Sequence, residues 1–256
     1  MTAVATTPDA SASVSVSAVS KVFGRGEEAV AALDGVDLAI GTGEFVCVVG
    51  ASGCGKSTLL NLLAGLDRPT LGHVHVTGRT ALMFQDAALF PWLTVADNVA
   101  LPLRLAGVGR RQRRERAEEL LAAVHLGGQG GRRPHELSGG MRQRVALARA
   151  LAQDADVLLM DEPFGALDAM TRDLLHDELE RLWSGRGLTV VFVTHNVREA
   201  ARLGDRIVLL TSRPGRVADT FDVGIPRPRR IDSPEVATLA ASVTDRLREE
   251  VRRHGR

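Results

Sequence analysis

A glycine-rich stretch, GASGCGKST at residues 50–58, constrains this chain more than any other part of its sequence. It fits the pattern G-x-x-x-x-G-K-[ST], with an apolar run before it and leucines at helical spacing after it. Glycines permit positive φ angles and let a ligand approach the backbone closely. Successive amide groups at the start of a helix can then surround a polyphosphate. The sequence therefore predicts a buried strand, a phosphate-binding loop and a helix over residues 44–66.

Lys56 is one of only two lysines among the 32 basic residues of the chain, and Lys21 is the other. Arginine supplies the positive charge everywhere else, so a lysine in this loop needs a specific reason. Its ammonium is a compact charge that fits between two phosphate groups, whereas a guanidinium is wide and planar. We therefore expect Lys56 to reach the β- and γ-phosphates and Ser57 to offer its hydroxyl to Mg²⁺. The predicted nucleotide contacts in this loop are Gly50, Ala51, Ser52, Gly53, Cys54, Gly55, Lys56, Ser57 and Thr58.

The alternative interpretation of the loop is a glycine-rich turn with a chance lysine, which the flanking strand and helix patterns disfavour. Lys21 has no comparable context, and we expect it to be an exposed charge. Neither lysine lies in the N-K-x-D motif with which a GTPase would recognise guanine. The sequence thus favours ATP as the nucleotide.

The charge distribution gives no sign of a nucleic-acid partner. The net charge is only +1, so no global attraction to nucleic acid or anionic lipid is expected. The basic stretch 110–116 runs into glutamates and contains no aromatic residue. We interpret it as the solvated face of a helix.

Length, cysteines and terminal segments indicate a cytosolic protein. The 256 residues fit one large domain, or a domain with a subdomain. The two cysteines, Cys47 and Cys54, do not suggest a disulfide framework, which indicates a reducing compartment. The N-terminus lacks the features of a signal peptide, and no apolar run is long enough to span a membrane.

Strand patterns alternate with helix patterns along the chain, which predicts an α/β fold. Residues 1–12 are small and polar and are expected to form a disordered tail. An antiparallel pair of strands follows, then the loop already described, and residues 86–152 change to short helical patterns. We interpret them as an inserted helical subdomain. A hairpin around Pro214 and Gly215 is expected to close the sheet, and residues 246–256 are expected to form a basic tail.

Acidic and polar residues at the ends of other apolar runs supply the second half of the predicted site. Asp161 and Glu162 follow the run DVLLM, where one carboxylate can hold Mg²⁺ and the next can orient an attacking water. An acidic turn after a strand is the simpler alternative. Gln85 and His195 also follow apolar runs, but each alone is a weak signal, and a strand-end histidine is usually a satisfied structural residue.

The string LSGGMRQRVALARAL at 137–151, together with the loop and LLMDEP, resembles the ATP-binding subunits of ABC transporters. The resemblance spans residues 13–245 and implies a P-loop NTPase with a RecA-like core, an N-terminal antiparallel β subdomain and an inserted helical subdomain. It implies that Glu162 is the general base, Gln85 the Q-loop glutamine, Asp161 a metal-site residue and His195 the switch histidine. It also implies that Phe23 stacks on adenine, that Asp168 belongs to the D-loop, and that the signature residues Ser138, Gly139 and Gly140 act on the ATP of a partner protomer.

Within the family, strings such as PWLTV and SRPGR resemble the importers of nitrate, sulfonates and taurine. Asn196 stands where that branch commonly has Asp, which removes a charge without abolishing the role of His195. The resemblance implies a head-to-tail dimer with a second copy or a paralogue. It also implies membrane permease subunits that dock through coupling helices, an extracytoplasmic solute-binding protein, and a location at the inner face of the cell membrane.

Three other functions fit parts of the pattern. An ABC exporter subunit would share all the chemistry; a soluble ABC protein of DNA repair or translation would need coiled coils or tandem ATP sites that this chain lacks. Glu162 and His195 argue against a catalytically silent regulatory module.

The sequence also leaves open the roles of Cys54 and of the pair Phe90 and Trp92. Cys54, at a helix start where thiol pKa values tend to fall, is a redox switch or a small loop filler, and Phe90 and Trp92 line a permease groove or belong to the core.

Overall fold

The structure, a computed structural model, describes residues 12–165 and 167–254. The chain forms two units, one containing the residues up to 78 and from 189 onwards, the other residues 79–188. All but the last residue of the predicted tail 1–12 lies outside the described residues, and β1 begins at Ala12. The predicted helical subdomain 86–152 lies inside the second unit, which also contains two strands and a further helix.

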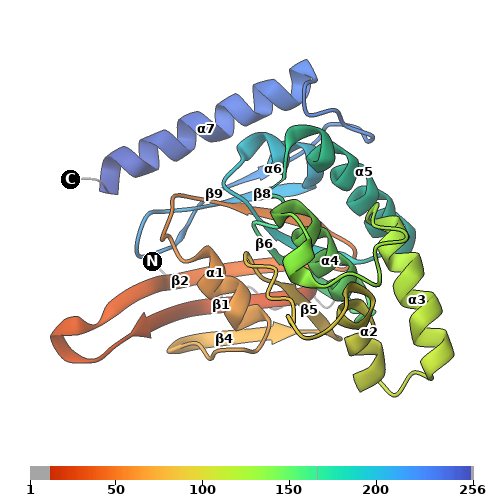
Figure 1. Cartoon of the computed structure of the whole chain (residues 1–256). Coiled ribbons are helices and arrows are strands. Elements are labelled where there is room, and N and C mark those ends of the chain that lie inside the picture. The colour runs from red at the N-terminus through yellow and green to blue at the C-terminus, as the bar shows by residue number, and fades with distance from the viewer. Residues whose placement is uncertain (1–11, 166, 255–256) are drawn as a thin grey trace. The chain divides into compact units, whose positions relative to one another are not determined.

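The first unit contains a three-stranded antiparallel sheet in the order β2-β1-β4 (Figure 1). It consists of β1 (Ala12–Phe23), β2 (Val30–Gly41) and β4 (Leu71–Val76). A short 3₁₀ turn, Gly26–Glu28, lies between β1 and β2. Valines 14, 16 and 19 on β1 are buried, so one face of the strand forms core. The predicted antiparallel pair is therefore confirmed, whereas β4 was not predicted because it contains Gly72 and two histidines instead of an apolar run.

A second set of strands in this unit carries the phosphate loop. Strand β3 (Phe45–Val49) is buried throughout and lies parallel to β7 (Thr189–Val193) on one side and β8 (Arg206–Leu210) on the other. β9 (Val217–Asp222) pairs antiparallel with β8, which confirms the predicted hairpin. Helix α1 (Lys56–Leu63) follows β3, and α6 (Val197–Leu203) follows β7.

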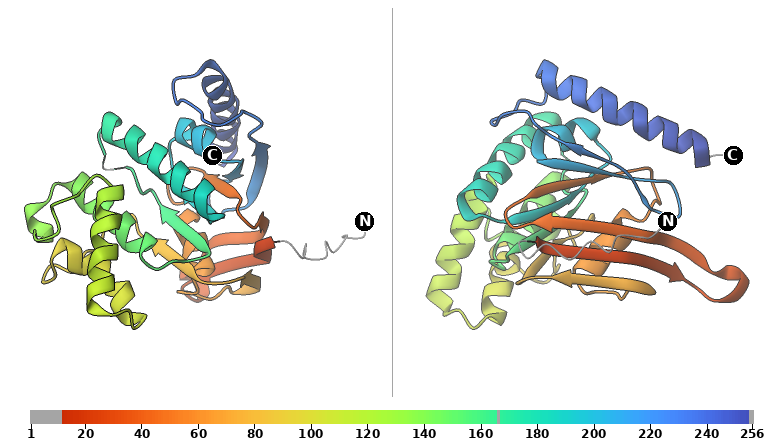
Figure 2. Two further views of the ribbon diagram at one scale, coloured as in Figure 1. Left: turned by 90° about the vertical axis from the view of Figure 1, so that its right-hand side faces the viewer. Right: turned by 180° about the vertical axis from the view of Figure 1, so that it is seen from behind.

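The C-terminal helix α7 (Pro234–His254) packs beside α6 (Figures 1 and 2). The expected basic tail 246–256 is therefore not a separate segment, because residues 246–254 continue this helix. Arg246 pairs with Asp219 of β9 and with Glu250 on its own helix. The contact with Asp219 joins residues 27 positions apart, so the composition of the segment alone did not indicate it.

The second unit contains two parallel strands and four α-helices. Strand β5 (Thr80–Met83) pairs with β6 (Val157–Asp161). Helices α2 (Val95–Leu105), α3 (Arg110–Ala123) and α4 (Gly139–Leu151) pack on one another, and a 3₁₀ turn, Pro134–Glu136, precedes α4. Helix α5 (Ala169–Arg186) completes the unit. Three arginines of α3 (Arg111, Arg114 and Arg116) pair with glutamates one turn away on exposed surface, as predicted for a solvated face.

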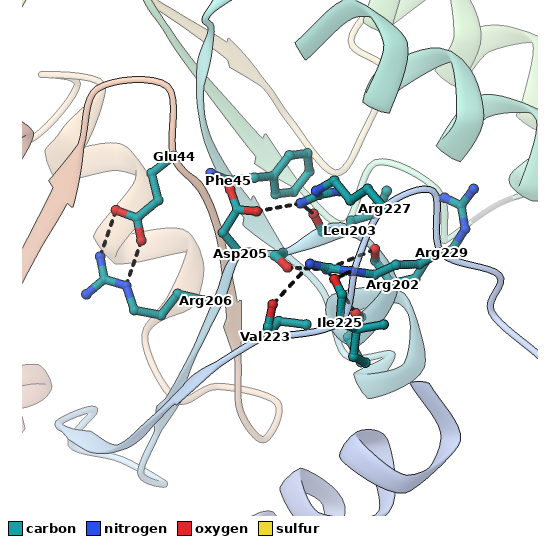
Figure 3. Close-up of polar contacts among 12 residues, drawn as sticks. Glu44, Phe45, Arg202, Leu203, Asp205, Arg206, Val223, Ile225, Arg227 and Arg229 are labelled. Carbon is teal, nitrogen blue, oxygen red and sulfur yellow. Dashed lines mark hydrogen bonds and ion pairs between the residues drawn. The ribbon is translucent and has the colours of Figure 1, made fainter. Parts of the chain in front are cut away.

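Arg229 joins the segment after β9 to the end of α6 (Figure 3). Its buried guanidinium donates to five backbone carbonyls at distances of 2.5 to 3.3 Å. The carbonyls belong to Ala201, Arg202, Gly204, Val223 and Ile225. The last carbonyls of a helix have no partner within the helix, so the arginine satisfies groups that would otherwise be buried without a donor.

Replacing Arg229 with alanine should lower the free energy of unfolding by about 2–4 kcal/mol, because several buried carbonyls lose their donor at once. Arg230→Ala is the matched control, since Arg230 is exposed and pairs with the exposed Asp232; it should change stability by about 0.5 kcal/mol or less. Urea unfolding followed by circular dichroism measures both. Equal effects of the two substitutions would contradict the role given to Arg229.

Candidate nucleotide site

The loop between β3 and α1 has the backbone geometry that a phosphate cradle requires. Gly53 and Gly55 have φ angles of 75° and 98°, in the left-handed region that favours glycine. A Cβ at Gly55 would lie 2.6 Å from Leu33 Cδ2 and 2.7 Å from the Ala32 carbonyl oxygen. Both the backbone angle and the neighbours therefore require glycine at this position, as the sequence pattern predicted.

The turn between β8 and β9 packs against the same loop. Gly215 donates to the Ala32 carbonyl at 2.9 Å and accepts from the Asp34 amide at 3.0 Å. A Cβ at Gly215 would lie only 2.1 Å from the carbonyl oxygen of Cys54. The sequence predicted a hairpin around Pro214 and Gly215. The structure adds that Gly215 lets this turn approach the phosphate loop closely.

Lys56 is the first residue of α1, and it is only 7% exposed. Its ammonium donates to the carbonyls of Gly50 at 3.0 Å and Ala51 at 2.9 Å, and it lies 3.7 Å from Cys54 Sγ. The positive charge of Lys56 is thus held inside the loop by the neighbouring backbone carbonyls of Gly50 and Ala51. Such an arrangement suits the small ammonium of lysine better than a planar guanidinium.

The hydroxyl residues that follow Lys56 lie at the start of α1, where the positive end of the helix dipole favours an anion. Ser57 is exposed and Thr58 is half-buried, and Ser52 within the loop is also exposed. An exposed hydroxyl beside a phosphate cradle is an oxygen ligand of the kind that Mg²⁺ accepts together with phosphate and water. The loop therefore fits both groups that the sequence predicted for it.

Cys54 is buried inside the loop, and this burial opposes the fall in thiol pKa that a helix start can cause. Burial raises the pKa of Cys54, and the nearby Lys56 ammonium only partly opposes this shift. The thiol contacts the loop so closely that a Cβ at Gly50 would lie 2.7 Å from its sulfur. Cys54 and Cys47 are both free and buried. The structure thus favours a small loop-filling role for Cys54 over a redox switch, since reactive cysteines are accessible thiolates.

Phe23 lies at the end of β1, where the residue is 45% exposed. Lys21, two residues earlier on the strand, is not the exposed charge that the sequence suggested. Its side chain is only 12% exposed and pairs with Asp67. Because Asp67 is distant in sequence, nothing in the local pattern indicated this partner.

His195 follows β7 and precedes α6, and its side chain is exposed. Asn196 caps α6, with its side-chain oxygen accepting from the amides of Arg198 and Glu199. The buried Thr194 hydroxyl donates to Glu199 at 2.5 Å and accepts from the Asn196 amide at 3.0 Å. Asparagine is as good an N-cap as aspartate. Asn196, which stands where related importers commonly have aspartate, can therefore still hold the turn that carries His195.

In the second unit, the structure brings Gln85 and Glu162 together. Glu162 follows Asp161 at the end of β6, and the Gln85 side-chain amide lies 3.4 Å from Glu162 Oε2. The Gln85 carbonyl in turn accepts from the buried Gln143 of α4 at 2.6 Å. Glu162 has a φ angle of 45°, a conformation that is uncommon for residues other than glycine. The pairing supports a shared site for residues that are 77 positions apart.

Two further helices of this unit begin with predicted site residues. Ser138 caps α4 by accepting from the Met141 amide at 3.2 Å, and Gly139 and Gly140 open the helix. Asp168 caps α5 through the Thr171 amide at 2.9 Å, and this hydrogen bond holds the pKa of Asp168 below its ordinary value. The start of α4 is therefore a second place where backbone amides can meet an anion.

An open cavity of about 360 Å³ lies beside α2, lined by Phe90, Trp92 and Leu101 with Arg104 and Arg113. The rings of Phe90 and Trp92 are 5.5 Å apart, and Trp92 is 67% exposed. Trp92 is thus not a core residue. The side chain of buried Asn98 holds the segment before α2, because it accepts a hydrogen bond from the Phe90 amide and donates one to the Phe90 carbonyl. The sequence analysis did not predict this role. The signal for it was a polar residue on the apolar side of α2.

Comparison with known proteins identifies the family. Residues 33–165 match the family described as ABC transporter. The chain belongs to this family. It is 42% identical over 239 residues to the aliphatic sulfonates import ATP-binding protein of Bacillus licheniformis. This alignment covers 90% of this chain and 92% of that protein.

Other members of the ABC transporter family are equally similar. The chain is 48% identical over 217 residues to the taurine import ATP-binding protein of Burkholderia pseudomallei, covering 82% of this chain and 84% of that protein. Its structure resembles a dimeric post-hydrolysis state of the ATP-binding cassette MJ0796 bound to ADP and Pi, with a TM-score of 0.78 and 36% identity over 83% of this chain and all of that one. The predicted fold class is confirmed. No helix among the described residues is long and apolar enough to cross a membrane.

Proposed function

We propose that this chain is the ATPase subunit of an importer, using ATP hydrolysis to drive a small anionic or zwitterionic solute such as a sulfonate, taurine or nitrate through a membrane permease. The observation that carries the proposal is the loop at residues 50–55, whose glycine geometry places a buried lysine charge at the start of α1. The names of the relatives, which are import ATP-binding proteins, support the direction of transport.

The chain's own residues divide the chemistry among them. The backbone amides of the loop and the Lys56 ammonium bind the β- and γ-phosphates and neutralise charge that develops on them. Glu162 orients the attacking water and accepts its proton, while the Gln85 amide, 3.4 Å away, holds that carboxylate in place. His195 donates a hydrogen bond to the γ-phosphate. Ser57, Asp161 and Gln85 are the oxygen donors that would hold Mg²⁺, which would help to neutralise the negative charge of the phosphates.

The start of α4 is proposed to act on the nucleotide of a second protomer. It is an amide-rich helix N-terminus capped by Ser138, and the chain has a single phosphate loop and a single sequence of this kind. The similar cassette MJ0796 is a dimer bound to ADP and Pi. We propose that two copies of this chain, or this chain and a paralogue, enclose two ATP molecules head to tail, with Asp168 near the shared interface.

The cavity beside α2 is proposed to receive a coupling helix of the permease. Its aromatic residues follow Gln85 closely in sequence, so a change at the glutamine can reach them through the short segment between. Exposed aromatic anchors around a groove are typical of surfaces that bind an amphipathic helix. Docking of this kind would keep the subunit at the inner face of the cell membrane, with an extracytoplasmic binding protein delivering the solute to the permease.

Glu162→Gln should lower ATP turnover by about a hundredfold or more, because the group that accepts the proton from water is lost. ATP binding should persist, so the variant should accumulate as an ATP-bound dimer. Turnover is measured by phosphate release and the dimer by light scattering with and without ATP. Glu118→Gln, on the exposed face of α3, is the matched control. Unchanged turnover in Glu162→Gln would refute its role as the base.

Trp92→Asp should weaken co-purification with the permease and abolish ATP-driven transport, while the isolated subunit still binds ATP and melts at the same temperature. Leu71→Asp is the control, because Leu71 is also 67% exposed but lies on β4. Its association with the permease should match that of the unmodified protein. If Trp92→Asp lowers the melting temperature without a specific loss of association with the permease, Trp92 stabilises the subunit and does not bind the permease.

A further inference from the structure

Lys21 makes three contacts that no role proposed above explains. Its ammonium donates to Asp67 Oδ1 at 2.6 Å and to the Arg68 carbonyl at 2.9 Å. Both acceptors lie shortly after the end of α1, the helix that begins with Lys56. The same ammonium lies 4.9 Å from the centroid of the Phe23 ring. One partly buried cation therefore connects the end of α1 with the aromatic ring at the end of β1.

The strand geometry explains how the cation reaches the ring. Lys21 and Phe23 are two residues apart on β1, so their side chains point to the same side of the strand. A cation over the face of an aromatic ring is attracted to its π electrons and restricts the positions that the ring adopts. Phe23 as a whole residue nevertheless remains 45% exposed. It is thus held in position and still accessible to a planar group.

We propose that Lys21 is a positioning residue for the nucleobase, holding the Phe23 ring as the surface on which adenine stacks. This inference rests on the proposed role of Phe23 in binding ATP. In this proposal Lys21 affects binding of the adenine base and not of the phosphates. The proposal also explains why lysine, and not arginine, occurs at position 21. The compact ammonium reaches two oxygen acceptors and a ring from one point, an arrangement that suits it better than a wide, planar guanidinium.

The backbone around Lys21 is held by other bonds, so its side chain can be removed without releasing β1. The Val22 amide donates to Thr70 Oγ1 at 3.0 Å, and the Thr70 amide donates to the Ser20 carbonyl at 2.8 Å. The hydrogen bond from Lys21 also lowers the pKa of Asp67, whose carboxylate stays charged and partly exposed when the lysine is replaced. Substitution of Lys21 is therefore expected to leave a folded protein.

The test compares the binding of Mg-ATP with that of inorganic triphosphate, which has no base, by titration calorimetry. Lys21→Met should raise the Kd for ATP by about two- to fivefold, the size expected for loss of one cation–π contact, and leave the Kd for triphosphate unchanged. Phe23→Ala should raise the Kd for ATP by about fivefold or more through lost base stacking. In the Phe23→Ala background, Lys21→Met should add nothing, because the lysine acts through the ring. Arg111→Met, which removes an exposed positive charge of α3, is the control and should bind both ligands as the unmodified protein does.

Three results would overturn the inference, and they are distinguishable. Equal weakening of ATP and triphosphate by Lys21→Met would show that the lysine acts on the phosphate loop through α1. Additive effects of the two substitutions would show that Lys21 and Phe23 act independently. Unchanged ATP binding by Phe23→Ala would remove the adenine role of Phe23 itself, and the proposal about Lys21 with it. Thermal melting of each variant checks that it is folded.

Discussion

The close approach of the phosphate loop to two neighbouring segments is the constraint on which the site depends. Gly55 touches β2 so tightly that a methyl group would collide with Leu33 and the Ala32 carbonyl. Gly215 in the β8–β9 turn meets the Cys54 carbonyl with equally little room. Strand β2 and the β8–β9 turn thus pack against the phosphate loop from different parts of the sequence. This packing favours the conformation in which the backbone amides and Lys56 lie close together. Close packing of this kind restricts the conformations of the loop, which reduces the entropy lost on binding a ligand.

The same unit places other groups at the ends of elements anchored to its core. The turn that carries His195 is held by Thr194 and by the Asn196 cap, and the far end of α6 is held by the guanidinium of Arg229. Phe23 is held through Lys21, which is bound to the segment after α1. His195 and Phe23, both proposed site residues, are therefore attached to elements held by several hydrogen bonds, and both remain exposed enough to meet a ligand.

Much of this arrangement could be predicted from local sequence. Gly53 and Gly55 fall in a pattern whose backbone geometry is fixed by the glycines themselves, and Ser138 and Asp168 precede helical patterns that they do cap. The residues that were misjudged depend on partners distant in sequence. Lys21 looked exposed because Asp67 is 46 positions away. Residues 246–254 looked like a tail because their packing partners lie on other elements.

The central claim is that the loop at residues 50–55 and the compact charge of Lys56 bind the phosphates of ATP. The most direct measurement is the affinity and turnover of Lys56→Arg, which keeps the charge but changes its shape. Because a guanidinium cannot occupy the arc between the Gly50 and Ala51 carbonyls, the Kd for Mg-ATP should rise by about tenfold or more, and turnover should fall with it. Arg111→Lys, a charge-preserving exchange on the exposed face of α3, should change neither. Near-normal ATP affinity and turnover in Lys56→Arg would contradict the account.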